Sequence, residues 1–156
     1  MPSNDQTEKF PSLKGKVILI TGASRGIGAA AAIRVARWGG SVVVNYHQNR
    51  DRALEVLQEI ERGGGKGMVI QADVTQKSQV EKMRKAVEEK FGPVDVLVNN
   101  AFFPFEINPI TQLSWEGVEE ATSKELSAFH NCTQVFVPGM IKIKGGKIIV
   151  VSTRLA

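Results

Sequence analysis

Residues 21–28 form a glycine-rich segment whose composition suits phosphate binding. They read Thr-Gly-Ala-Ser-Arg-Gly-Ile-Gly and lie between a short apolar run and an alanine-rich stretch. The first turn of a helix carries unpaired N–H groups and a partial positive charge, and both favour a phosphate. Gly22 allows a tight exit from a strand, Gly26 lets a phosphate approach the backbone, and Gly28 lets the helix pack closely. The spacing predicts a pyrophosphate site for a dinucleotide; a turn that uses glycine only for tightness is the alternative.

Apolar runs that alternate with amphipathic stretches place this segment after the first strand of a sheet. We predict strands over residues 17–20, 42–46, 67–71, 94–98 and 147–151, and helices over residues 27–38, 50–62, 77–91 and 114–143. The strand runs lack polar alternation, as expected of strands buried on both faces. Strands and helices that alternate through short connections predict an α/β fold of the Rossmann type. The expected architecture is a doubly wound parallel sheet with helices on both faces, truncated after the fifth strand.

A single domain accounts for the sequence after a short arm. Residues 1–12 are polar and contain proline, so we predict a flexible N-terminal arm, with the domain over residues 13–156. Asn49 and Ser114 are typical helix N-caps, and we expect each side chain to cap a helix. The fifth strand is apolar on both faces, yet no further strand follows it in the sequence. We therefore expect an exposed sheet edge unless another chain covers it.

Composition and charge argue against several classes of protein. Hydrophobic residues make up 42% of the 156 residues and charged residues 23%, which is ordinary for a globular domain and excludes a disordered or collagen-like chain. The net charge is +4, but the basic residues form no stripe along the sequence, and aromatic residues make up only 6% of the chain. We therefore expect no nucleic-acid partner. No apolar run approaches the ~20 residues that cross a bilayer, and the N-terminus lacks a signal-peptide pattern. We expect no membrane contact and a cytoplasmic location.

The cysteine and histidine content predicts no metal centre. Cys132 is the only cysteine and cannot form an internal disulfide, which fits a reducing cytoplasm. Its place inside the long predicted helix favours a packing role over a nucleophilic one. His47 and His130 are too few and too far apart in the sequence to predict a metal site.

Three motifs resemble the short-chain dehydrogenase/reductase family. They are the segment 21–28, Asp73-Val74 after the third strand, and Asn99-Asn100-Ala101 after the fourth. The resemblance covers about residues 13–156 and is greatest to the 3-oxoacyl-(acyl-carrier-protein) reductase type. It implies an oxidoreductase that transfers hydride between a nicotinamide cofactor and a small carbonyl or acyl substrate. The residues that it implies are Gly22, Ser24, Arg25, Gly26, Ile27 and Gly28 for the phosphates, Asp73 and Val74 for the adenine, and Asn99, Asn100 and Ala101 for the nicotinamide-side ribose.

The end of the second strand favours NADP(H) over NAD(H). An NAD site usually carries a carboxylate about 20 residues beyond the glycine-rich loop, where it binds the ribose 2′-hydroxyl. Counting from Gly28 arrives at Asn45 and His47 with no carboxylate, and both join the predicted cofactor site. Arg25 would add charge-assisted hydrogen bonds to a 2′-phosphate, and the resemblance implies the same preference. The alternative for Arg25, and for the possible helpers His47 and Arg50, is a solvated charge.

The resemblance also implies a catalytic serine after the fifth strand and an asparagine in the long helix. Alignment with the family's Ile-Ser-Ser ending puts Thr153 at the serine position, with Ser152 before it. A threonine hydroxyl donates the same hydrogen bond, so both are candidate catalytic residues; polar strand ends without a role are the alternative. Glu125 stands where the asparagine is expected, and Phe102 replaces the glycine of Asn-Asn-Ala-Gly. These departures predict altered substrate geometry or reduced activity.

The family's acid/base pair, Tyr-x-x-x-Lys, is absent from the sequence. Tyr46 is the only tyrosine, and no lysine follows it four residues later. We therefore expect this 156-residue chain to be inactive by itself. Two functions stay open: the cofactor-binding part of an NADP(H)-dependent oxidoreductase, or a non-catalytic NADP(H)-binding sensor or partner subunit. Abundant apolar residues in helix 114–143 predict a homo-oligomer that forms through this helix.

Overall fold

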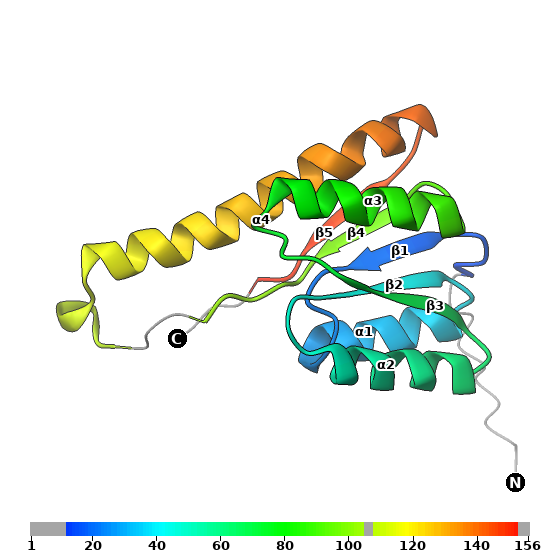
Figure 1. The fold of residues 1–156 in the computed structure, drawn as a ribbon, viewed down its shortest axis with the longest axis horizontal. Coiled ribbons are helices and arrows are strands. Elements are labelled where there is room, and N and C mark those ends of the chain that lie inside the picture. Colours follow the sequence, from blue (N-terminus) through cyan, green and yellow to red (C-terminus); the bar gives the residue numbers. More distant parts are fainter. Residues whose placement is uncertain (1–11, 105–107, 153–156) are drawn as a thin grey trace, which may run out of the picture.

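A parallel sheet lies between two layers of helices in this computed structural model, which describes residues 12–104 and 108–152 (Figure 1). The sheet has the order β3-β2-β1-β4-β5. Its strands are β1 (Val17–Ile20), β2 (Ser41–Tyr46), β3 (Lys66–Gln71), β4 (Val96–Asn99) and β5 (Lys147–Val150). One face is covered by α1 (Gly26–Arg37) and α2 (Arg50–Arg62), the other by α3 (Lys77–Phe91) and α4 (Trp115–Lys142), and a one-turn 3-10 helix, η1 (Ile110–Gln112), precedes α4. The predicted Rossmann-type α/β fold is confirmed.

Strand β1 is buried on both faces because its alternate side chains enter two separate cores. Val17 and Leu19 belong to the core that α3 and α4 complete, whereas Ile18 and Ile20 belong to the core under α1 and α2. All four side chains are at most 5% exposed. The apolar run without alternation is therefore explained by a central strand between two helical layers.

The predicted element boundaries agree with the structure to within one residue, except at β4. This strand begins at Val96 instead of the predicted Val94. Asp95 intervenes, and its carboxylate accepts a hydrogen bond from the Val17 N–H (2.9 Å) and pairs with Lys16 Nζ (2.7 Å). The start of β4 is thus fastened to the start of β1 by a side chain.

One of the two predicted helix caps is present. The Ser114 hydroxyl accepts a hydrogen bond from the Gly117 N–H at 3.1 Å, as expected of an N-cap at the start of α4. Asn49 does occupy the N-cap position of α2, but its side chain makes no capping hydrogen bond. The predicted Asn49 cap is therefore wrong, and this side chain lies instead beside the pocket described below.

Helices α1, α2 and α4 end in the same backbone arrangement, with a left-handed residue just beyond the helix. Gly39 and Gly64 occupy this place after α1 and α2, at φ of +88° and +75°. After α4 the residue is Lys144, at φ of +53°. The Lys144 N–H donates to the Ile141 carbonyl, and the Gly145 N–H donates to the Met140 carbonyl, both at 3.0 Å. This pair of hydrogen bonds is the Schellman arrangement.

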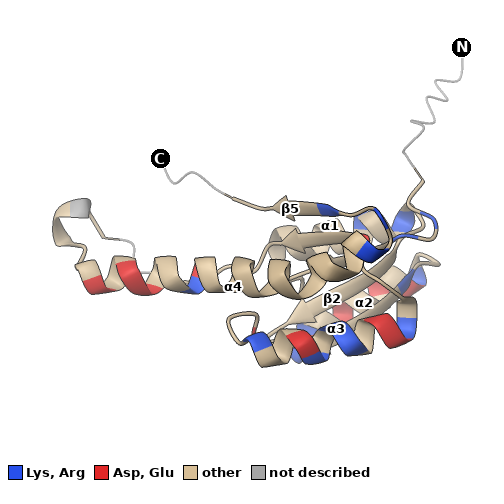
Figure 2. Cartoon of the chain, turned by 90° about the horizontal axis from the view of Figure 1, so that it is seen from above, with Lys and Arg blue, Asp and Glu red and all other residues tan. Residues whose placement is uncertain are grey.

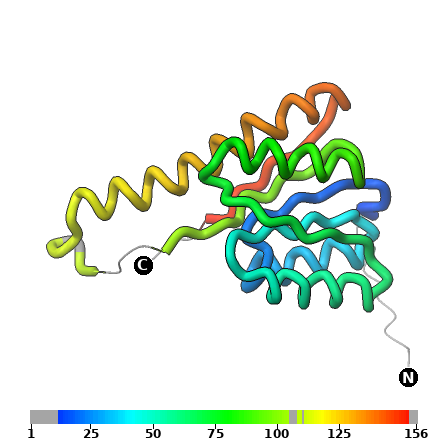
Figure 3. Tube along the Cα trace, viewed as in Figure 1, coloured from blue at the N-terminus to red at the C-terminus, as the bar shows by residue number. Residues whose placement is uncertain are grey.

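Helix α4 extends beyond the sheet at its N-terminal end (Figures 1 and 3). It exposes several large apolar side chains, with Trp115 72%, Leu126 62% and Ile141 70% accessible. Strand β5 forms one edge of the described sheet, and all its residues are exposed. Of the described helices, α4 included, none combines the length and apolar character that a membrane span requires. Basic and acidic residues are interspersed along α3, with no continuous basic stripe there (Figure 2).

Candidate functional site

The glycine-rich turn after β1 is held in place by β2. The Gly22 N–H donates to the side-chain oxygen of Asn45 (3.2 Å), and the Ala23 N–H donates to the Asn45 backbone carbonyl (2.8 Å). Gly22 has a φ of +61°, and a Cβ there would lie 2.8 Å from the Cα of Ala101. Both the backbone conformation and the close approach therefore require glycine at this position.

A second set of hydrogen bonds clamps the same turn to the segment after β4. Thr21 Oγ1 accepts hydrogen bonds from the N–H groups of Asn100 (2.9 Å) and Ala101 (3.0 Å). The Asn100 side-chain amide donates to the carbonyls of Thr21 (2.9 Å) and Gly22 (3.3 Å). A Cβ at Gly28 would collide with this amide. Gly28 is thus needed for the approach of α1 to Asn100, a more specific reason than close packing on the sheet.

The first turn of α1 faces open space. Gly26 has a φ of +57°, with no atom of the described protein within 4 Å of the place of a Cβ. Ile27 is 68% exposed, and the first turn carries no acidic residue. Arg25 forms no ion pair with any residue in the described ranges. The unpaired N–H groups and the Arg25 guanidinium together give this end of α1 a positive character that suits an anion.

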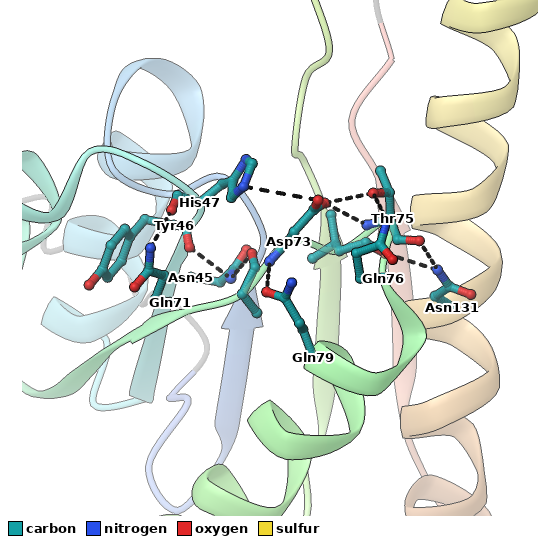
Figure 4. Close-up of polar contacts among 11 residues, drawn as sticks. Asn45, Tyr46, His47, Gln71, Asp73, Thr75, Gln76, Gln79 and Asn131 are labelled. Carbon is teal, nitrogen blue, oxygen red and sulfur yellow. Dashed lines mark hydrogen bonds and ion pairs between the residues drawn. The ribbon is translucent and has the colours of Figure 1, made fainter.

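At the end of β2, one predicted site residue is buried and another is exposed (Figure 4). Asn45 is 2% exposed, and its amide donates to the Ala72 carbonyl at 3.1 Å, so its side chain joins β2 to the segment after β3. His47 is exposed, and its Nε2 lies 4.0 Å from Oδ2 of Asp73. Asn45 therefore supports the site from within, while His47 and Asp73 stand on its surface.

The turn between β3 and α3 is fixed by its own side chains (Figure 4). Asp73 Oδ1 accepts hydrogen bonds from the Thr75 N–H (3.0 Å) and the Thr75 hydroxyl (2.7 Å). The Asp73 N–H donates to Gln79 Oε1 at 2.8 Å. From α4, the Asn131 amide donates to the carbonyls of Val74 (3.2 Å) and Thr75 (2.9 Å). Asp73 and Val74 consequently have a fixed orientation at the carboxyl edge of the sheet.

These segments enclose a pocket of about 1010 Å³ at the carboxyl ends of the strands. The sequence-predicted residues that line it are Gly22, Ser24, Arg25, Gly26, Ile27, Asn45, His47, Asp73, Val74, Asn100, Ala101 and Ser152. Gly28 and Asn99 do not line it, and Thr153 lies outside the described residues. Lining residues that were not predicted as site residues are Gln48, Asn49, Ala72, Phe102, Phe103, Pro104, Glu125, Val150 and Val151. Four of them, Gln48, Ala72, Phe102 and Val151, directly follow or precede a predicted residue, and this adjacency was the signal that could have identified them.

Glu125 and Phe102 line the same pocket, as do Val150 at the end of β5 and the two residues after it. Glu125 Oε1 accepts a hydrogen bond from the Phe103 N–H at 3.4 Å, which links α4 to the segment after β4. Phe102 is 61% exposed on the pocket lining. Both residues that depart from the family pattern are therefore at the site, as is the hydroxyl-bearing Ser152.

Cys132 lies in the core, away from the pocket. It is fully buried against the sheet, and this burial raises the pKa of its thiol to about 12. Its packing role is consistent with that environment. Among the described residues, no three histidine, cysteine, aspartate or glutamate side chains gather in a way that could hold a metal ion.

A glycine-rich turn that opens the first helix, at the carboxyl edge of a doubly wound parallel sheet, is the arrangement of a Rossmann-type nucleotide-binding domain. The family model described as short chain dehydrogenase matches residues 16–156. The chain belongs to the short-chain dehydrogenase family.

Curated relatives and solved structures agree with this assignment. The chain is 38% identical over 134 residues to the 3-oxoacyl-(acyl-carrier-protein) reductase FabG of Staphylococcus epidermidis, which covers 86% of this chain and 54% of the relative. It is 36% identical over 138 residues to FabG of Staphylococcus aureus, covering 88% and 56%. The chain thus spans about half the length of these curated relatives.

Two solved structures share the fold with a TM-score of 0.83 and 31% identity. One is a metagenomic short-chain oxidoreductase in complex with NADP, matched over 93% of this chain and 65% of that one. The other is a short-chain type dehydrogenase/reductase from Mycobacterium marinum, matched over 91% and 57%.

Proposed function

We propose that this chain binds NADP(H) and forms the cofactor site of an oxidoreductase that acts on a carbonyl or alcohol substrate. The observation that carries the proposal is the convergence of three segments on one pocket: the turn after β1, the turn after β3 and the segment after β4. Further support comes from a structural relative at 31% identity that is in complex with NADP. The curated relatives are 3-oxoacyl-(acyl-carrier-protein) reductases, so we propose that the substrate is a 3-oxoacyl group on a carrier protein.

The residues of the pocket have separate tasks in this proposal. The first turn of α1 holds the pyrophosphate through its N–H groups. Asp73 and Val74 contact the adenine, and Asn100, through its clamp on Thr21, keeps the glycine-rich turn in place. Bound NADP(H) would supply the hydride. The Ser152 hydroxyl donates to the substrate oxygen, a task for which Thr153 is the other candidate.

The preference for NADP(H) over NAD(H) rests on Arg25. Arg25 lines the pocket without a carboxylate partner among the described residues, so a 2′-phosphate would be its first ion pair. A charge-assisted hydrogen bond contributes about 1.5–3 kcal/mol, which corresponds to roughly 10- to 150-fold in affinity. We expect NADPH to bind at least about tenfold more tightly than NADH.

Calorimetric titration with both cofactors tests this preference. The Arg25→Ala variant should lose most of the difference between NADPH and NADH. Arg52→Ala is the matched control, because Arg52 is exposed on α2 and does not line the pocket. Tighter binding of NADH by the unaltered chain would contradict the proposal, and so would an equal loss in the two variants.

A second function, a non-catalytic NADP(H)-binding sensor or partner subunit, is favoured by two other residues that line the pocket. Phe102 is exposed there and Glu125 is bonded to a backbone N–H, in positions where the family carries glycine and asparagine. We expect the 156-residue chain to bind NADPH without oxidising it in the presence of a 3-oxoacyl thioester. Sustained loss of NADPH absorbance with that substrate would refute this expectation.

We also propose a cytoplasmic location. The support is the single cysteine of the sequence, Cys132, which is buried as a free thiol. Proteins of oxidising compartments more often pair their cysteines in disulfides.

A further inference from the structure

A buried asparagine interrupts the apolar face that α4 turns to the sheet. Asn131 is 9% exposed and has Cys132 and Phe136 among its buried neighbours on the helix. Burying an amide among apolar side chains costs free energy unless its polar atoms find partners. The Asn131 amide donates to two consecutive carbonyls, those of Val74 (3.2 Å) and Thr75 (2.9 Å). The partners of this residue therefore lie in the turn between β3 and α3.

That turn carries two pocket-lining residues. Asp73 and Val74 both line the pocket, whereas Asn131 does not. The Asp73 carboxylate is oriented from one side by the N–H and hydroxyl of Thr75. The Asn131 amide holds the carbonyls of Val74 and Thr75 from the α4 side, so the peptide groups on either side of Thr75 cannot rotate freely (Figure 4).

We propose that Asn131 is a positioning residue for the adenine end of the bound dinucleotide, acting through the turn that presents Asp73 and Val74. This inference rests on the proposed function. Loss of the Asn131 amide should therefore affect one part of the site and not the other. It disturbs the segment of residues 73–75 and leaves the glycine-rich turn intact. That turn has its own supports, Asn45 and Asn100.

The experiment compares two halves of the cofactor. Three proteins are compared: the unaltered chain, Asn131→Asp and Asn131→Ser. Each is titrated with 2′,5′-ADP and, separately, with nicotinamide mononucleotide, and NMR measures the binding of whichever ligand has the lower affinity. Asn131→Asp keeps the size of the side chain but places an oxygen against two carbonyl oxygens. Asn131→Ser is the milder change, and it keeps the test valid if the first variant does not fold. We expect the affinity for 2′,5′-ADP to fall about tenfold and that for nicotinamide mononucleotide to change less than about twofold.

Thr133→Val is the matched control on the same helix. Thr133 Oγ1 is buried and has no hydrogen-bond partner in the described part of the chain, so replacing the hydroxyl should leave both affinities unchanged. Equal losses for the two ligands, or a lower unfolding midpoint with both affinities intact, would overturn the positioning role alone. If the unaltered chain binds neither ligand, the proposed function fails and this inference fails with it.

Discussion

Thr21 shows how a single side chain assembles the candidate site. Its hydroxyl oxygen accepts two backbone N–H groups, those of Asn100 and Ala101, from a segment that lies 79 and 80 residues further along the chain. Thr21 is 1% exposed, so water cannot replace the oxygen. The geometry of the phosphate turn thus depends on a contact between the loops that follow two different strands.

Thr21→Val should destabilise the chain and weaken NADPH binding together. The substitution keeps the shape but leaves two partly buried N–H groups without an acceptor, at a cost of up to about 1–3 kcal/mol for each. Urea unfolding measures the change in free energy, and titration measures the change in affinity. Thr21→Ser retains the oxygen and serves as the control, with an expected effect well below that of valine. Equal effects of the two substitutions would show that the methyl group, not the hydroxyl, is what matters.

Cys132 should be unreactive toward thiol reagents while the chain is folded. Burial raises the pKa of its thiol to about 12, so the reactive thiolate is almost absent near neutral pH. We expect labelling by a maleimide only under conditions that unfold the protein, with labelling and circular dichroism following the same urea dependence. Rapid labelling in the absence of urea would contradict the buried position.

The same shift predicts how stability changes at high pH. The unfolded thiol ionises near pH 8.5, whereas the folded thiol holds its proton until about pH 12. The contribution is therefore full below about pH 8.5 and is lost progressively as the pH rises toward 12, by roughly 1 kcal/mol per pH unit. The difference in unfolding free energy between the unaltered chain and Cys132→Ala isolates this effect from other titrating groups. A difference that does not change over this pH range would refute it.

At the scale of the elements, the ends of the helices are built alike but with different residues. The left-handed position after α1 and α2 is glycine, and after α4 it is Lys144. A side chain in this conformation brings its Cβ close to the backbone, and glycine avoids that contact. The end of α4 is therefore less favourable than the other two.

Lys144→Gly should stabilise the chain by about 0.5–1 kcal/mol, because it relieves the left-handed strain at the end of α4. Gly64→Ala is the converse control and should destabilise. No atom of the described residues lies within 4 Å of a Cβ at Gly64, so that change measures the backbone strain without a clash. Thermal unfolding of both variants checks the pair. A loss of stability in Lys144→Gly would show that the lysine side chain makes a favourable contribution greater than the strain.

The elements could be predicted from the sequence because their signals are local. Apolar runs, helix caps and glycine stops gave most boundaries, and the motif order placed the site at the carboxyl ends of β1, β3 and β4. The clamp between Thr21 and Asn100 could not be predicted, since it joins residues far apart in the chain. The support of Asn45 for Gly22 was missed for the same reason, and Asn45 was taken only as a cofactor contact. The cap at Asn49 was predicted from its residue type alone. Asparagine is also common among the polar residues that line pockets, and Asn49 lines the pocket without making a capping hydrogen bond.

At the scale of the whole molecule, α4 offers the surface most suited to association. Trp115, Leu126 and Phe129 are 72%, 62% and 40% exposed on this helix, and large apolar side chains exposed together on one element are a common mark of a protein interface. We propose that the chain forms a homo-oligomer through α4.

Light scattering after size exclusion should therefore show a dimer or a tetramer. Leu126→Lys combined with Phe129→Lys should produce the monomer, because two charges would then have to be buried at the interface. Glu55→Lys, on the exposed surface of α2, controls for the change in net charge. The far-ultraviolet circular dichroism of all three proteins should be alike. A monomeric unaltered chain would contradict the proposal.

The central position of β1 also sets an order of events during synthesis. Chains emerge from the ribosome at about 5–20 residues per second, N-terminus first. The two strands on one side of β1 in the sheet, β2 and β3, are complete by Gln71, so the Asn45 support for the phosphate turn is available early. The other half of the clamp arrives only with Asn100 and Ala101. A nascent chain should therefore gain its capacity to hold a nucleotide in a single late step, when β4 takes its place beside β1.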